Sequence, residues 1–174
     1  MPIRFADSLA LTRRVLSVLI GLNLLMGVLV LLLLIASLVA ETLVMTGLGA
    51  RPTGSNGAQI IAMRVIMLVG IGGVPLAHVV LTRLRTIVDT VSVGDPFLPE
   101  NAVRLRVIAW SVLCIELLHV VVGIVAMIGS SASEPIGVNW TFSATRWIAV
   151  LLLFVLAQVF TEGARMREDL EGTV

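Results

Sequence analysis

Two ionisable side chains inside a long apolar stretch are the first candidates for chemistry. Glu116 and His119 lie three residues apart between Val107 and Ser133, where Glu116 is the one charged residue. In a helix this spacing places both side chains on one face. Because an ionised group at the centre of a bilayer costs about 2.5–3.5 kcal/mol on insertion scales, the pair requires either a partner or a function.

The Glu-x-x-His spacing of these two residues is also that of the metal-binding helices in di-iron bundles. Such a site needs a second copy of the motif and two further Glu residues, and His78 has no Glu at the matching position. The other apolar stretches supply no carboxylate at this depth. We therefore predict no metal and no cofactor within one chain. A homo-oligomer could supply a second motif.

Polar or interrupted backbone occurs at a similar depth in two other apolar stretches. Asn23 lies about 13.5 Å from Arg14 along a helix, and Glu116 lies about 15 Å from Arg106. Pro75 has no N–H for the carbonyl of the preceding turn, so a kink is expected there. The predicted intramembrane polar cluster comprises Asn23, Gly72, Gly73, Pro75, Glu116 and His119.

This cluster has two interpretations. In the favoured one, Glu116 is protonated, or it forms hydrogen bonds with His119, Asn23 or the carbonyls freed at Pro75, and the polar groups join helices. In the alternative, the cluster lines an ion, proton or ligand site of a small transporter. No nucleophile–base arrangement or phosphate-binding loop occurs, so we predict no catalytic residues and no enzyme.

The amino-acid composition indicates whether the chain lies in water or in a lipid bilayer. Of 174 residues, 58% are hydrophobic and 13% are charged, whereas soluble domains have about 45–50% apolar and about 25% charged residues. The net charge of +1 does not suggest direct binding to nucleic acid. The single cysteine, Cys114, excludes an internal disulfide, and its apolar neighbours predict an inert packing residue. The chain is therefore expected to lie in the lipid bilayer.

Four apolar stretches are long enough to cross a bilayer core of about 30 Å. They span residues 15–40, 60–82, 107–129 and 143–162, and the last needs Arg146 to extend its charge to the headgroups. The predicted architecture is one all-α membrane domain over residues 1–174, an antiparallel four-helix transmembrane bundle.

The arginines predict the orientation of this bundle. Most of them fall on one side of the membrane: Arg4, Arg13, Arg14, Arg83, Arg85, Arg104, Arg106, Arg165 and Arg167. The positive-inside rule then places both termini and the hairpin 83–106 in the cytoplasm. On the outer side, the glycine-rich loop 41–59 resembles a flexible connector. Glu41 and Arg64 flank this loop and could pair, although solvated positions are favoured.

The cytoplasmic hairpin has its own turn signals. Apolar residues recur at helical spacing from Leu84 and predict a helix to about Val93. Gly94 suits the residue just beyond a helix end, whereas Pro99 and Glu100 suit the first turn of the next helix. The special residues therefore have a structural role in the turn, and exposed Phe97 could alternatively contact a partner or the membrane.

The hairpin also carries a resemblance to a known family. The sequence runs Gly94-Asp95-Pro96-Phe97-Leu98-Pro99-Glu100-Asn101 and then Arg104-Leu105-Arg106. This resembles the G-x-P-F-x-x-E-N and R-L-R signature of the DUF2975 family of bacterial membrane proteins. The C-terminal stretch from Gly163 is similar to that family's ending, although Glu171-Gly172 intrude before Thr173-Val174. The resemblance implies four spans in a bacterial inner membrane. It also implies a pairing with a small helix-turn-helix regulator of the Xre type, because members are often encoded beside one.

Two functions follow as hypotheses. In the first, the bundle is an anchor, and the hairpin together with the tail from Glu162 binds a cytosolic regulator. The hairpin residues assigned to this role are Gly94, Pro96, Phe97, Glu100, Asn101, Arg104 and Arg106. In the second, the chain is a small ion- or proton-coupled transporter centred on Glu116.

Overall fold

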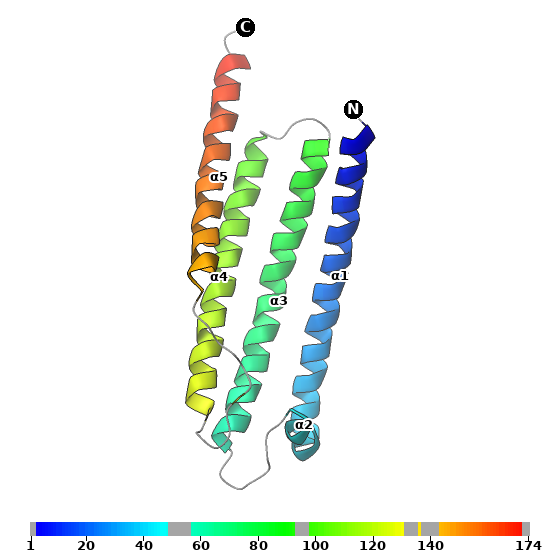
Figure 1. Ribbon diagram of the computed structural model, residues 1–174, viewed down its shortest axis with the longest axis vertical. Coiled ribbons are helices and arrows are strands. Elements are labelled where there is room, and N and C mark those ends of the chain that lie inside the picture. The colour runs from blue at the N-terminus through cyan, green and yellow to red at the C-terminus, as the bar shows by residue number, and fades with distance from the viewer. Residues whose placement is uncertain (1–2, 49–56, 93–97, 131–135, 137–142, 172–174) are drawn as a thin grey trace. The chain divides into compact units, whose positions relative to one another are not determined.

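The computed structural model describes residues 3–48, 57–92, 98–130, 136 and 143–171, and within them every regular element is a helix (Figure 1). The elements are α1 (Ile3–Val39), α2 (Glu41–Gly47), α3 (Gly57–Ser92), α4 (Pro99–Gly129) and α5 (Ala144–Glu171). The four helices other than α2 are long and apolar enough to cross a membrane. The prediction of an all-α protein with four membrane spans is confirmed.

Backbone hydrogen bonding explains why these segments are helical. In lipid every peptide group must find its partner within the chain, and a helix satisfies this demand locally. Hydroxyl side chains obey the same rule: Thr82 donates to the carbonyl of His78 at 2.7 Å, and Thr161 donates to that of Ala157 at 2.8 Å. α3 contains Pro75 and remains one helix, while α4 begins at Pro99, as the turn signals predicted.

Large apolar side chains cover the outside of the helices. On α1 the exposed residues include Leu22, Leu25, Leu29 and Leu32, and on α5 they include Leu151, Leu152 and Val155. Contiguous apolar surface of this extent is not tolerated in water. It matches the hydrocarbon core of a bilayer, so the chain is a multi-pass membrane protein.

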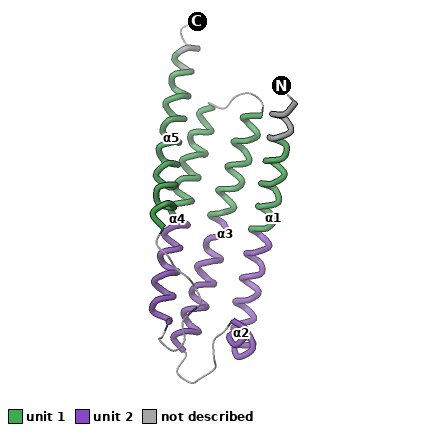
Figure 2. The backbone as a smooth tube through the Cα atoms, viewed as in Figure 1, with its two compact units in different colours: residues 1–23, 76–114, 143–174 green, residues 24–75, 115–142 purple. Residues whose placement is uncertain are grey.

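The chain divides into two compact units that cut across the helices (Figure 2). Unit 1 comprises Met1–Asn23, Leu76–Cys114 and Ser143–Val174. Its core contains Leu105 and Ile108 of α4 and Ala157 of α5, with partly buried side chains of α3, α4 and α5 packed against them. At the border of this core, the rings of Trp110 and Phe154 meet edge to face with centroids 5.3 Å apart.

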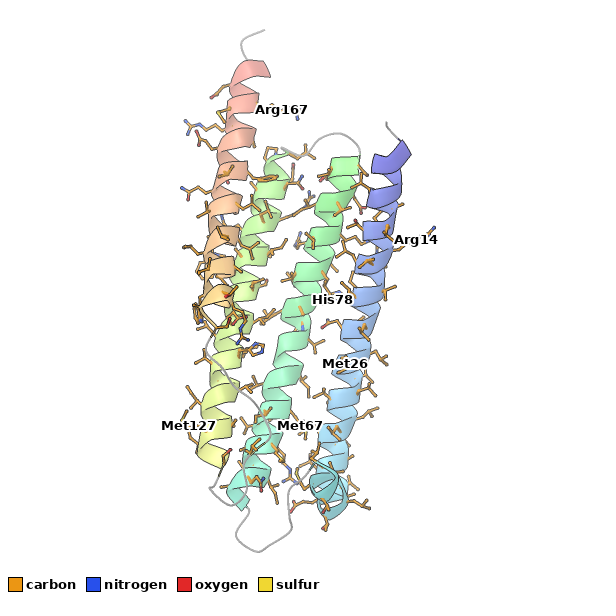
Figure 3. All side chains as sticks on the ribbon, viewed as in Figure 1. Arg14, Met26, Met67, His78, Met127 and Arg167 are labelled. Atoms are coloured by element: carbon orange, nitrogen blue, oxygen red, sulfur yellow. The ribbon has the colours of Figure 1, made fainter. Side chains whose placement is uncertain are left out.

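Unit 2 comprises Leu24–Pro75 and Ile115–Phe142. Small residues bring its helices close together: a methyl group added at Gly129 of α4 would overlap Ala62 of α3. A methyl group at Gly27 of α1 would lie 2.9 Å from Cγ1 of Val74. Met67 is buried in this unit, whereas Met26 and Met127 are exposed (Figure 3).

The loop between the first two spans, predicted to lie outside, differs from its prediction. Its beginning was expected to be a flexible connector, but Glu41–Gly47 form the short helix α2. The chain breaks at Ala40, where φ is −126° and ψ is 57°, and α2 then buries Met45. Burial of this side chain offsets the weak helix propensity of the threonines and the glycine. The remainder of the loop, residues 49–56, lies outside the described residues.

Candidate functional site

A buried amide joins the two helices of the predicted cytoplasmic hairpin in unit 1. Asn101 of α4 has no exposed surface, and its Nδ2 donates to Oγ1 of Thr90 on α3 at 2.8 Å. Nη1 of Arg104 donates to Oδ1 of Asn101 at 2.7 Å, and the Thr90 hydroxyl lies 2.8 Å from the carbonyl of Ile87, to which it can donate. The Thr90–Asn101–Arg104 network therefore fixes α3 against α4 next to the turn.

A second polar connection joins α1 to the last turns of α3. Nε of Arg13 pairs with Asp89, and Nη2 of Arg13 donates to Oγ of Ser92 at 2.9 Å. Both charged side chains are part-exposed, at 44% and 42%. Sequence analysis missed this pair, and the available signal was Asp89 near the end of the predicted hairpin helix. The α3 side of the hairpin is thus also connected to α1.

The other predicted hairpin residues divide into three groups. Glu100 is exposed in the first turn of α4. Arg106 is also exposed, and it lines cavities between α4 and α5. Gly94, Pro96 and Phe97 lie outside the described residues. Of the predicted set, the structure therefore brings Asn101 and Arg104 into direct contact.

The predicted intramembrane pair occupies two different environments. Glu116 is buried, with 9% of its surface exposed, whereas His119 is exposed one turn further along α4. A rotation of about 60° along the helix is enough to separate a packed face from a lipid-facing one. The shared face expected from the spacing does not give the two side chains a shared environment.

The glycines near Pro75 do not provide close packing. A methyl group at Gly72 would meet no described atom within 4 Å, and one at Gly73 would lie 4.0 Å from Cδ1 of Leu118. Asn23 belongs to unit 1, whereas Pro75 belongs to unit 2. The assignment of these residues to one functional cluster stays a prediction.

His78 is a polar residue that the sequence interpretation did not include in either site. It lies on α3 within unit 1 and is half-buried (Figure 3). Its Nδ1 is buried and has no hydrogen-bond partner among the described residues. No three His, Cys, Asp or Glu side chains gather as metal ligands would in the described part of the chain.

The predicted outer end of the first two spans carries an ion pair in unit 2. Nη2 of Arg64 lies 2.8 Å from Oε2 of Glu41 and donates to the carbonyl of Ser37 at 2.7 Å. The favoured prediction of separate solvated positions is wrong, because the Arg64 side chain is 24% exposed and contacts both Glu41 and the end of α1. Cys114, expected to pack inside, is exposed.

Comparison with known proteins gives one family match. The chain matches the model of DUF2975, a family described as proteins of unknown function, over residues 50–174. This match covers α3, the hairpin with Asn101 and Arg104, α4 and α5. The protein is a multi-pass membrane protein, and it belongs to the DUF2975 family. No curated protein and no solved structure matches the chain.

Proposed function

We propose that the protein is a membrane-anchored regulatory protein of the bacterial inner membrane. It presents the α3–α4 hairpin and the end of α5 to a cytosolic protein, such as a small helix-turn-helix regulator. The orientation follows from the arginines at that end, which place both termini in the cytoplasm.

The length of the helices together with the Thr90–Asn101–Arg104 network carries this proposal. α3 has 36 residues, or about 54 Å of helix, against a bilayer core of about 30 Å. The network holds the part of α3 that extends beyond the bilayer core in one arrangement with α4. A rigid protruding element loses little conformational entropy when a partner binds, which favours binding.

The charges of the hairpin suggest what the partner surface must offer. Arg83 and Arg85 are exposed on α3, and Arg165 is exposed on α5. These guanidinium groups favour a partner that brings carboxylates to the membrane surface. A regulator held there would be kept from other binding sites in the cell.

Site-specific photo-cross-linking in native membranes tests this proposal. A photoreactive residue at Arg85 or Glu100 should capture one defined protein, identified by mass spectrometry, whereas the same residue at the apolar position Leu29 should capture none. The charge reversal R83E/R85E should abolish capture from Glu100. Capture of lipid alone at both hairpin positions, or a reporter fusion that places Val174 outside, would contradict the proposal.

Glu116 supports a second candidate function. A buried carboxyl group in the middle of an apolar helix is a feature of ion- and proton-coupled transporters. If the chain is such a transporter, E116Q should abolish uptake of the substrate while leaving cross-linking at Glu100 unchanged. The regulatory proposal expects the reverse: E116Q should leave partner regulation unchanged, and R83E/R85E should abolish it.

A further inference from the structure

Two neighbouring cavities follow the seam between α4 and α5 in unit 1. One of about 510 Å³ is lined by Pro99, Ala102, Val103, Arg106, Thr161, Ala164 and Arg165. The other, of about 430 Å³, is lined by Arg106, Trp110, Phe154, Ala157, Gln158, Thr161 and Glu162. Because Arg106 and Thr161 line both, the two cavities form one depression, the α4–α5 groove.

The groove is basic at one end and aromatic at the other. Arg106 and Arg165 line the first cavity, while Trp110 and Phe154 close the second with their edge-to-face contact. Val103 and Trp110, which are seven residues apart on α4, are 60% and 57% exposed. Arg106 lies between them along α4, and Trp110 is about 6 Å beyond Arg106 by the helical rise. From Arg106 to Trp110 and Phe154 the lining of the groove therefore changes from cationic to aromatic, as an amphipathic ligand requires.

The side chains of the two groove arginines differ from those of three arginines that have partners elsewhere in the chain. Arg13 pairs with Asp89, Arg64 pairs with Glu41, and Arg104 donates to Asn101. Within the described part of the chain, Arg106 and Arg165 have no hydrogen bond or ion pair. Two guanidinium groups that line one cavity repel each other unless an anion lies between them. A phosphodiester is well suited, because guanidinium groups donate paired hydrogen bonds to its oxygens.

The position of the arginines along the helices identifies the source of that anion. Arg106 immediately precedes the apolar stretch that begins at Val107, and Arg165 follows the apolar part of α5. Both guanidinium groups are therefore expected at the level of the lipid headgroups, with Trp110 about 6 Å deeper. Basic pockets between membrane helices bind anionic lipid headgroups at this level.

We propose that the α4–α5 groove binds one anionic phospholipid from the surrounding leaflet. Its phosphate contacts Arg106 and Arg165, and its acyl chain follows Trp110 and Phe154. The carboxylate of Glu162 lines the neighbouring cavity and weakens the positive potential of the groove. The inference needs the membrane but not the cytosolic partner, so it can hold or fail independently of the proposed function.

Fluorescence quenching by brominated lipids tests this site in the full-length protein. The protein is reconstituted in phosphatidylcholine vesicles that contain a minor fraction of phosphatidylglycerol, with bromine on the acyl chains of one lipid or the other. The W110F variant identifies the signal of Trp110. Brominated phosphatidylglycerol should quench Trp110 about five- to tenfold more effectively, per mole of lipid, than brominated phosphatidylcholine.

Matched variants separate a built site from general attraction to a charged surface. R106Q/R165Q should abolish the preference for phosphatidylglycerol, whereas R83Q/R85Q removes two exposed arginines outside the groove and should retain it. E162Q should increase the preference about two- to threefold, and soluble glycerol phosphate should not displace the lipid. Equal quenching of the unmodified protein by both lipids would overturn the proposal. An equal loss in both double variants would also overturn it, because general surface charge would then explain the preference.

Discussion

Unit 1 holds its helices with buried and part-exposed polar groups around an apolar core, whereas unit 2 combines one polar contact, that of Arg64 with Ser37 and Glu41, with close packing at glycines. In unit 1 the amide of Asn101 joins α3 and α4. In unit 2 the absence of a side chain at Gly129 leaves room for Ala62. A polar network specifies one arrangement of two helices because hydrogen bonds have a preferred direction. Small residues specify it because they let the two backbones approach closely. Four substitutions test whether the two units depend on these different interactions.

The largest effect is expected for Asn101→Ala in unit 1. The substitution leaves the guanidinium of Arg104 without its acceptor and removes the donor to Thr90, so we expect a loss of about 2–3 kcal/mol in the free energy of unfolding. Detergent-titration unfolding followed by tryptophan fluorescence measures this loss. Glu100→Ala, at the exposed neighbour, should change stability by less than about 0.5 kcal/mol. Equal effects of the two substitutions would show that the network does not stabilise the hairpin.

A smaller effect is expected for Gly129→Ala in unit 2. The new methyl group would overlap Ala62, whose own Cβ cannot rotate away, so α3 and α4 must separate at a cost of about 1–2 kcal/mol. Gly72→Ala is the matched control, because its methyl group meets open space, and it should be neutral or stabilise α3 by up to about 1 kcal/mol. The same unfolding titration compares them. If Gly72→Ala were destabilising and Gly129→Ala neutral, the claim that the helices of unit 2 pack closely at Gly129 would be contradicted.

Arg64→Gln should cost about 1 kcal/mol, because the carbonyl of Ser37 and the carboxylate of Glu41 both lose a charged donor. Glu41→Gln should cost less, because Arg64 keeps its bond to Ser37 and the Glu41 side chain is 52% exposed. A double-mutant cycle of these two substitutions measures their coupling. If the coupling equals the whole loss seen for Arg64→Gln, the contact with Ser37 contributes nothing.

The smallest effect is expected for Arg13→Gln, at about 0.5 kcal/mol, because both members of its ion pair are part-exposed. The difference from the unmodified protein should shrink in 1 M salt, where charges are screened within about 3 Å. Arg14→Gln, at the next exposed position, should have no measurable effect in either salt concentration. A loss for Arg13→Gln that persists in high salt would show that its hydrogen bond to Ser92, and not the charge, is what matters.

Sequence patterns predicted the hairpin more successfully than the intramembrane cluster. Pro99 and Glu100 mark the start of α4 through their own backbone and charge preferences, which are local properties. The burial of Glu116 beside an exposed His119 depends on which face of α4 meets another helix, and spacing along one helix does not specify this. The cytoplasmic role of the hairpin residues stays a prediction for the same reason, since a partner surface is not encoded in local preferences.

Local physical chemistry along the chain determined four apolar helices and their approximate ends, whereas their orientation in the membrane stays a prediction. Each of these depends on the transfer of individual residues into lipid and on hydrogen bonds within one helix. Only the tertiary structure decided that Asn101 contacts Thr90, that Gly129 leaves room for Ala62, and that Arg106 and Arg165 line one groove. These contacts join residues that are distant in sequence, and they exist only after the helices adopt one rotation and register against each other.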